Sequence, residues 1–370
     1  MKICYLAHGQ SVHTERWLKY FVQKGHEVHL ITLWPADSAF KEMGVIVHEP
    51  IKSSRSGLLR KLNMVLVTPQ IIQLIHKIKP DILHAHNATQ YGLLAALSSW
   101  PYTLTVWGSD ITVLAKNSRL IRFFTKIIVK KAKCITCDGY HMIRRLVELG
   151  AKPENVRLIF FGTDVLKFKP RKKDIKLRHQ LSAGEGPLII SLRGLTPLYD
   201  VGSLIRAAPI VLKQVPNAKF LIFHDGEQRA ELEKLSIDLR VSKNVKFMGR
   251  VSSTELPKIL TSMDVYVSTS LSDAGIAAST AEAMACGLPV VITDFEDNKI
   301  WVKNGINGFL VPLKNPEALA EKIIFLLKNK TARLKFGKNN RKIIEKRNNY
   351  YVEMDKMEKV YKTLLRANER

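Results

Sequence analysis

The residues from Val267 to Pro312 constrain the fold of this chain most, because they predict a strand, a loop, a helix and a second strand in close succession. The Val-Tyr-Val run at 265–267 predicts a buried strand that ends in small polar residues, as strands do where they reach solvent. A helix is expected over Thr280–Cys286 and a second buried strand over Val290–Thr293. A unit of this kind places its binding site at the carboxyl end of the first strand.

The predicted loop, residues 268–279, consists mostly of Ser, Thr, Ala and Gly, with Asp273 as its carboxylate. Such a loop lets a ligand approach the backbone closely and presents N–H groups to it. Ser279 or Thr280 is expected to cap the following helix, and Glu282 to lie in its first turn. The start of a helix favours a phosphate or pyrophosphate, because free N–H groups and the macrodipole point outward. In the alternative interpretation Glu282 only complements the helix dipole, and the small residues permit close packing.

The strings EAMACGLPVV and NGINGFLVP in this segment resemble the nucleotide-sugar half of retaining glycosyltransferases with the GT-B architecture, specifically glycosyltransferase family 4. The resemblance extends over most of the chain. In that family an acidic residue stands eight positions before a glutamate that holds the hydroxyls of the donor ribose. Glu282 matches the glutamate, whereas Ala274 stands at the position of the first acid and Asp273 lies one residue earlier. The resemblance implies that Glu282 contacts the ribose and that Asp273 orients the donor sugar.

The size and charge of the chain limit its organisation and its partners. With 370 residues, 46% of them hydrophobic, it is long enough for two domains with separate cores. The formal net charge of +25 implies an anionic partner or surface, which nucleic acid, anionic lipid or a phosphorylated substrate would provide. No apolar run reaches the roughly 18 residues of a membrane span, and the N-terminus lacks the pattern of a signal peptide. We therefore expect a cytoplasmic protein.

The cysteines and carboxylates predict neither a disulfide framework nor a metal site. Four cysteines are too few for a disulfide framework in a chain of this length. Cys134 and Cys137 form one C-x-x-C, but zinc would need a second pair of ligands, and none has that spacing, so we expect structural cysteines on a short strand. No D-x-D triplet occurs, so a metal bridging a diphosphate lacks evident ligands. We expect no metal and no cofactor besides the nucleotide-sugar co-substrate.

Predicted strands and helices alternate through both halves of the chain, which indicates parallel sheets. The opening shows the pattern, with a strand at Lys2–Leu6, a helix at Thr14–Lys24 and a strand at Glu27–Leu33. The expected class is α/β with GT-B architecture, in which two Rossmann-like domains face each other across a cleft and a C-terminal helix crosses back to the first domain. The predicted boundaries are 1–168 for an acceptor-binding domain, 169–186 for a basic linker, 187–345 for a nucleotide-sugar-binding domain and 346–370 for the C-terminal helix.

Several predicted strands of the N-terminal half end in residues that suit an acceptor site. Gly9 follows the first strand, although a single glycine is not a dinucleotide fingerprint. His84 and His86 point to the same side of a strand; by themselves they have a structural interpretation, but the family has a similar D-x-x-H-x-H at this place. Trp107 stands where family members usually carry a histidine, and Asp110 either orients a sugar hydroxyl or caps a helix. The predicted acceptor-binding residues are His13, His86 and Trp107.

Residues 116–133 contain seven Lys or Arg and no acid, interleaved with large apolar residues. A helix with aromatic residues on one face and positive charge on the other binds well to an anionic bilayer, where each basic residue contributes about 1 kcal/mol. In the other arrangement the apolar face packs on the domain core and the basic residues are simply solvated. The high net charge favours membrane contact. The residues expected there are Arg119, Arg122, Phe123, Phe124, Lys126 and Lys130.

The resemblance implies further donor contacts in the C-terminal half. Arg193 matches an arginine that binds the donor diphosphate, whereas Tyr199 stands at about the place of a lysine with the same role. A guanidinium binds a diphosphate in a bidentate way and a phenol donates one neutral hydrogen bond, so binding depends mainly on Arg193. The nucleobase would lie against His224, Gly226, Phe247, Met248 and Gly249. Backbone N–H groups of Ala274, Gly275, Ile276, Ala277 and Gly9 would complete the donor site.

These patterns predict a hexosyltransferase-like enzyme that moves a sugar from a nucleotide-sugar donor to a hydroxyl of a glycan or lipid-linked acceptor, with retention, as the resemblance implies. The expected setting is the synthesis of surface polysaccharide, such as lipopolysaccharide, or glycolipid, peripherally at the inner face of the cytoplasmic membrane and without nucleic acid. Asp110, Asp273 and Arg193 are the predicted catalytic residues. Two other classes stay open: a GT-B-like sugar-nucleotide epimerase, which would need no acceptor, and a non-catalytic basic relative that binds membranes or nucleic acid.

Overall fold

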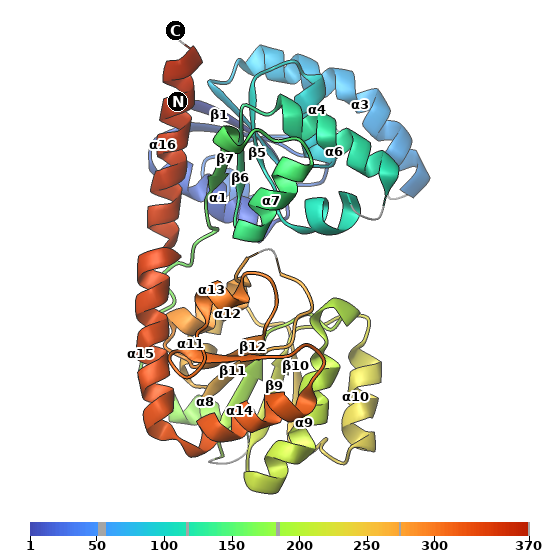
Figure 1. Cartoon of the computed structure of the whole chain (residues 1–370). Coiled ribbons are helices and arrows are strands. Elements are labelled where there is room, and N and C mark those ends of the chain that lie inside the picture. The colour runs from blue at the N-terminus through green and yellow to red at the C-terminus, as the bar shows by residue number, and fades with distance from the viewer. Residues whose placement is uncertain (51–56, 116–117, 183–185, 274, 369–370) are drawn as a thin grey trace. The chain divides into compact units, whose positions relative to one another are not determined.

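The structure, a computed structural model, describes residues 1–50, 57–115, 118–182, 186–273 and 275–368. These residues form two compact units, each built on one parallel sheet (Figure 1). The first unit comprises residues 1–161 together with the C-terminal residues from Val352, and the second comprises residues 162–351. The predicted α/β class with two domains is thus confirmed. The first unit ends before the boundary that the sequence predicts at residue 168.

The sheet of the first unit has seven strands in the order β3-β2-β1-β4-β5-β6-β7, and neighbouring strands pair in parallel. Its strands are β1 (Lys2–Leu6), β2 (Glu27–Ile31), β3 (Ile46–His48), β4 (Ile82–His86), β5 (Tyr102–Thr105), β6 (Cys134–Cys137) and β7 (Val156–Leu158). Most residues of the central strands are buried, as expected for a parallel sheet covered on both faces. Because the chain order reverses between β1 and β4, the carboxyl ends of these strands form a switch point where ligands usually bind.

Helices surround this sheet, and the C-terminal helix joins them (Figure 1). They are α1 (Val12–Gln23), α2 (Ser38–Glu42), α3 (Gly57–Ile78), α4 (Gln90–Leu97), the π-helix η1 (Asp110–Leu114), α6 (Arg119–Lys131), α7 (Tyr140–Glu148), the short η2 (Pro153–Asn155) and α16 (Tyr350–Asn368). Tyr361 of α16 is fully buried, and its hydroxyl lies 3.0 Å from that of Tyr5 and 2.5 Å from Nδ1 of His84. The C-terminal helix therefore packs on the first unit, as predicted.

The second unit repeats the arrangement with a six-stranded parallel sheet in the order β10-β9-β8-β11-β12-β13. Its strands are β8 (Leu188–Ser191), β9 (Lys219–Phe223), β10 (Val245–Gly249), β11 (Val265–Ser268), β12 (Val290–Thr293) and β13 (Gly308–Val311). Its helices are α8 (Ile175–Ser182), η3 (Pro197–Tyr199), α9 (Val201–Gln214), α10 (Arg229–Asp238), α11 (Leu256–Thr261), α12 (Ala278–Ala285), α13 (Asn298–Trp301), α14 (Pro316–Lys328) and α15 (Lys330–Arg347). The switch point of this sheet lies between β8 and β11.

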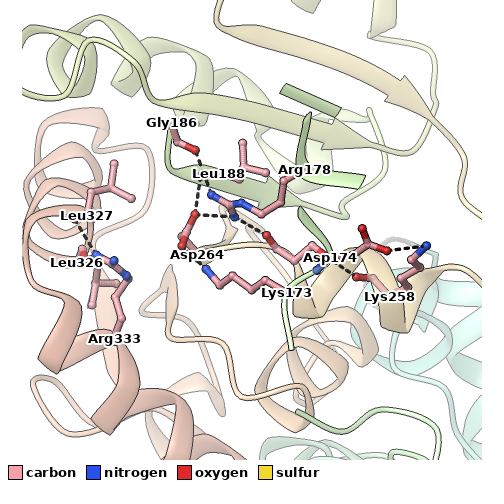
Figure 2. Close-up of polar contacts among 11 residues, drawn as sticks. Lys173, Asp174, Arg178, Gly186, Leu188, Lys258, Asp264, Leu326, Leu327 and Arg333 are labelled. Carbon is pink, nitrogen blue, oxygen red and sulfur yellow. Dashed lines mark hydrogen bonds and ion pairs between the residues drawn. The ribbon is translucent and has the colours of Figure 1, made fainter. Parts of the chain in front are cut away.

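The predicted linker, residues 169–186, folds with the second unit and contains α8. Figure 2 shows how it is held: Lys173 and Arg178 both pair with the buried Asp264, which directly precedes β11. The second oxygen of Asp264 lies 3.0 Å from Arg178 and accepts the backbone N–H of Leu188 at 2.8 Å. The basic residues that suggested a linker thus neutralise a buried carboxylate at the amino end of the sheet.

The start of α12 differs from the prediction. The helix begins at Ala278, and its N-cap is Ala277, which makes no side-chain capping bond, so Ser279 and Thr280 are not caps. The hydroxyl of Ser279 instead lies 2.8 Å from the hydroxyl of Tyr266, and Thr280 donates to the same tyrosine at 3.3 Å. Both hydroxyls are used inside the domain, where Tyr266 extends from β11. Since the helix starts earlier than expected, Glu282 lies beyond its first turn.

Candidate active site

Two loops meet at the switch point of the second sheet. The loop after β8 carries Arg193 and the loop after β11 carries Asp273, and both follow carboxyl ends of neighbouring strands. Two hydrogen bonds hold the loops together: Thr269 Oγ1 donates to the carbonyl of Tyr199 at 2.9 Å, and the N–H of Leu271 donates to the carbonyl of Leu198 at 2.9 Å. The sheet topology therefore brings two of the three predicted catalytic residues to one place.

Arg193 is the most constrained side chain of this site. Its Nη2 lies 2.5 Å from Oδ1 of Asp273, and its Nη1 donates to Oγ of Ser279 at 3.3 Å. The guanidinium carbon lies 4.3 Å from the centre of the Tyr199 ring, close enough for a cation–π interaction. Tyr199 thus supports the guanidinium from one face, where the resemblance predicted a contact to the ligand. The Nε atom is buried and has no hydrogen-bond partner among the described residues, so the guanidinium has unused donor capacity.

The ion pair between Arg193 and Asp273 is largely excluded from solvent, with 10% and 12% of the two side chains exposed. Burial raises the pKa of Asp273, and the attraction of Arg193 offsets this effect only in part. For Arg193, burial alone would lower the pKa, but Asp273, Tyr266 and Tyr199 raise it above the ordinary value. The site therefore keeps a fixed positive charge whose present counter-ion is a desolvated carboxylate.

The start of α12 lies beside this pair. Gly275, Ile276 and Ala277 are buried and precede the helix, while Ala274 lies outside the described residues. Glu282 is partly buried on the same helix. The helix therefore connects the loop of Asp273 with Glu282, the residue predicted to bind the ribose, as the motif implied.

The loops after β9 and β10 lie next to the loop of Arg193. The N–H of His224 donates to the carbonyl of Gly249 at 2.7 Å, and that of Leu195 to the carbonyl of Asp225 at 3.2 Å. A Cβ atom at Gly226 would lie 2.3 Å from the carbonyl oxygen of Leu195, so only glycine permits this contact. The predicted nucleobase residues, including the partly buried Phe247 and Met248, thus occupy the same edge of the sheet as Arg193.

The predicted acceptor residues form an aromatic cluster in the first unit. The rings of His13 and His86 lie 5.1 Å and 5.2 Å from that of Trp107, which stacks on Phe161 at 4.8 Å. Burial lowers the pKa of His86 to about 3, and burial with the charge of Arg16 lowers the pKa of His13 to about 4, so both are neutral near pH 7. Neither ring nitrogen of His86 has a hydrogen-bond partner among the described residues. Sequence reasoning missed Phe161, which lies in the segment that follows the carboxyl end of β7.

Asp110 and Gly9 have structural contacts that compete with their predicted roles. The carboxylate of Asp110 is buried and accepts the N–H groups of Ala88 at 2.7 Å and of Trp107 at 3.1 Å. Burial raises its pKa even though these backbone bonds lower it. The N–H of Gly9 donates to Thr32 Oγ1 at 3.0 Å. Asp110 therefore holds the loops that position Trp107, and the N–H of Gly9 is already used within the first unit.

Helix α6 presents the predicted membrane residues to solvent. Leu120 and Phe123 are 66% and 58% exposed, Phe124 is also exposed, and Ile128 and Val129 on the opposite side are buried. Arg119, Arg122, Lys126 and Lys130 are all exposed. Among the residues that the structure describes, none of the helices combines the length and the apolar character of a membrane span. Within the same residues, no cluster of three or more His, Cys, Asp or Glu side chains is placed to bind a metal.

Two family models match the chain, one in each half. The model described as glycosyl transferases group 1 matches residues 172–343, and the model described as glycosyl transferase 4-like matches residues 2–139. N-acetyl-alpha-D-glucosaminyl L-malate synthase of Bacillus anthracis is 23% identical over 92% of this chain and 90% of its own length. The UDP-Gal:alpha-D-GlcNAc-diphosphoundecaprenol alpha-1,3-galactosyltransferase of Escherichia coli is 26% identical over 79% of this chain and 77% of its own length.

Solved structures agree with these matches at the level of the fold. The crystal structure of Anabaena Alr3699/HepE in complex with UDP-glucose superposes with a TM-score of 0.83 at 19% identity, over 98% of this chain and 100% of that chain. Together the two family matches span most of the sequence, and each lies in one of the two units described above. The chain therefore belongs to the group 1 glycosyltransferases and has their GT-B fold.

Proposed function

We propose that this enzyme transfers a sugar from a nucleotide-sugar donor to a hydroxyl of a glycan or lipid-linked acceptor, with retention, in surface polysaccharide or glycolipid synthesis. The observation that carries the proposal is the buried Arg193 guanidinium at the carboxyl edge of the second sheet, where a diphosphate would find a fixed cation. The similar Anabaena structure is a complex with UDP-glucose, and the name of the E. coli relative states a UDP-Gal donor and a diphosphoundecaprenol acceptor. Retention is what the family resemblance implies.

In the donor half, Arg193 stabilises the negative charge that develops on the leaving diphosphate. Glu282 accepts hydrogen bonds from the ribose hydroxyls, and Asp273 orients the transferred sugar. In the first unit, His13, His86 and Trp107 bind the acceptor. The contacts of His13 and His86 with Trp107 support this assignment, because they bring the three predicted residues into one cluster. We assign Asp110 a positioning role for Trp107, since backbone N–H groups engage its carboxylate.

A thermal-shift panel of UDP-, GDP-, ADP- and CMP-sugars tests the donor site. One nucleotide should raise Tm, since saturation at 100 times Kd adds about 2.7 kcal/mol to the stability of the folded state. Glu282→Ala should reduce this shift, because the ribose loses its acceptor. We propose that Arg193 replaces a metal ion, so the shift and the transfer rate should be unchanged by EDTA. Loss of transfer in EDTA with recovery in Mg²⁺ or Mn²⁺ would refute metal independence, and the absence of any shift would refute the donor site.

We also propose that α6 holds the enzyme peripherally at the inner face of the cytoplasmic membrane. The exposed side chains of Leu120, Phe123 and Phe124 form an apolar surface on α6, which has no acidic residue. Exposed apolar side chains flanked by cations suit the boundary between lipid headgroups and acyl chains. A lipid-linked acceptor would be presented at the same surface.

Vesicle flotation at fixed salt tests membrane binding. Arg119→Glu/Arg122→Glu should release the protein from vesicles that contain phosphatidylglycerol. Phe123→Ser leaves the net charge unchanged and should also weaken binding, because it removes an exposed apolar side chain. At about 1 kcal/mol for each basic residue, loss of the two arginines alone should lower partitioning roughly 30-fold, and the two added carboxylates should lower it further. Lys234→Glu/Lys243→Glu makes the same change in net charge on exposed positions of the second unit and should bind almost as well as the native protein. Equal losses in the two double variants would show that net charge, and not α6, causes binding.

A further inference from the structure

The side chain of Asp273 has a partner that its predicted role does not explain. A residue that orients the donor sugar should present its carboxylate to the ligand, but here the carboxylate lies 2.5 Å from Nη2 of Arg193, in the loops at the β8–β11 switch point. The two residues are 80 positions apart in the chain, so the fold and not local sequence brings them together. No other ion pair of Arg193 occurs among the described residues.

Carboxylate and phosphate oxygens compete for the same guanidinium hydrogens. Both are anions that accept two parallel N–H bonds from arginine, and in a poorly solvated site each is strongly preferred to water. The donor diphosphate must therefore either displace Asp273 from Arg193 or bind beside it as a second anion in a site with little solvent. Binding beside it would place two negative charges next to one buried cation.

Displacement requires that the loop of Asp273 can release the carboxylate. The described residues between Ser268 and Ala278 form no helix or strand, and the hydrogen bonds of this loop to the loop of Arg193 lie earlier, at Thr269 and Leu271. Besides the ion pair, Asp273 has a side-chain hydrogen bond with Ser270, which belongs to the same loop. Burial already disfavours the ionised form of Asp273, so the carboxylate gains solvation when it leaves. Arg193 stays in place, because Tyr199 supports its face and Ser279 accepts a hydrogen bond from Nη1.

We propose that Asp273 is an internal counter-ion that occupies the diphosphate position on Arg193 in the free enzyme and is exchanged for the diphosphate when the donor binds. This inference rests on the proposed donor site and assigns a new role to one of its residues. In this exchange Asp273 acts on the diphosphate through Arg193 and is a positioning residue for it, in addition to the sugar contact proposed above. It lowers the affinity for donor and for the nucleotide product alike. Return of the carboxylate to Arg193 then speeds the release of the nucleoside diphosphate after transfer.

Calorimetric titration with UDP and with inorganic pyrophosphate tests the exchange. Asp273→Asn keeps the shape of the side chain and removes its charge, so both ligands should bind at least about 10-fold more tightly than to the native protein, as expected for a close charge pair. Uridine, which has no phosphate, should be unaffected. In steady-state transfer, inhibition by the nucleoside diphosphate, which carries no sugar for Asp273 to orient, should increase. Asp273→Ala should behave similarly if the asparagine variant folds poorly.

Asp294→Asn is the matched control. Asp294 is exposed and follows β12 at the same edge of the sheet, so the substitution removes the same charge without touching Arg193. It should leave the affinity for UDP and pyrophosphate within about twofold of native. Unchanged or weaker binding to Asp273→Asn, while the native protein binds and Arg193→Ala does not, would overturn the exchange and leave the donor site intact. If neither the native protein nor any variant binds UDP or pyrophosphate, the donor site itself would be overturned.

Discussion

Arg193→Ala is expected to lower kcat/KM for sugar transfer by about 100-fold to 1000-fold, the range found when one preorganised donor to a developing negative charge is removed. Arg193 provides the cation at the β8–β11 switch point, and within the described part of the chain its buried Nε has no hydrogen-bond partner beside the bonds of the guanidinium to Asp273 and Ser279. Arg193→Lys should recover only part of the loss, because an ammonium cannot make the planar two-point contact. Initial rates over a range of donor concentrations, with CD spectra and Tm for each variant, measure the effect.

Arg193→Ala also changes the surroundings of Asp273, the ion-pair partner of Arg193. Removing Arg193 leaves the buried carboxylate of Asp273 without its cation, so Tm should fall as well as activity. The double variant Arg193→Ala/Asp273→Ala should recover much of the lost Tm while transfer stays low. Arg206→Ala, at an exposed position on α9, is a control for loss of one positive charge and should be near native. Recovery of transfer in the double variant would show that Arg193 stabilises the loop and does not act on the diphosphate.

The sequence predicted the sheet-forming segments well where burial makes the signal continuous. Lys2–Leu6, Cys134–Cys137 and Val290–Thr293 are strands where the sequence predicts them, because a strand covered on both faces is mostly apolar. The short β3 and β13 were not predicted. β3 lies at a sheet edge, where partial exposure weakens the apolar pattern, and β13 contains a glycine.

The candidate site shows where sequence reasoning ends. Arg193 and Glu282 follow from a linear motif, so their positions after a strand and on a helix could be predicted. The pairing of Arg193 with Asp273 could not, because it depends on how two loops far apart in the chain meet. Local patterns misled at Ser279, whose small polar side chain is typical of a helix cap but here contacts Tyr266 and Arg193. The tyrosine hydroxyl in a buried strand was the signal that such a partner was needed.

The positively charged segment before β8 was misread for a related reason. Lys173 and Arg178 were assigned to an interdomain linker on composition, since the sequence does not show that they share the buried carboxylate of Asp264 (Figure 2). A carboxylate before a buried strand predicts only that it needs partners. Burial would raise the pKa of Asp264, but the charge and hydrogen bond of Lys173, the N–H of Leu188 and the charge of Arg178 hold it below the ordinary value.

Asp264→Ala is expected to destabilise the second unit by about 3 to 5 kcal/mol, the cost of removing one partner from a buried ion pair. At this size of unit the change corresponds to a Tm lower by roughly 10 °C. The loss has three sources: Arg178 is left largely buried without its counter-ion, the N–H of Leu188 loses its acceptor, and α8 loses its attachment to the sheet. Glu317→Ala, at an exposed position on α14, is a control and should change Tm little.

The pH dependence identifies the charge as the cause. A carboxylate whose pKa is lowered by folding stabilises the protein fully above its unfolded pKa of about 3.9, and this contribution is lost as pH falls through the lower folded pKa. Denaturant unfolding of the native protein should therefore show stability falling below about pH 4. Asp264→Asn, which keeps an acceptor for Leu188 but has no charge, should be less stable at pH 7 and should lack this part of the decline. Parallel curves for the two proteins would assign the role of Asp264 to its hydrogen bond with the backbone and not to its ion pairs with Lys173 and Arg178.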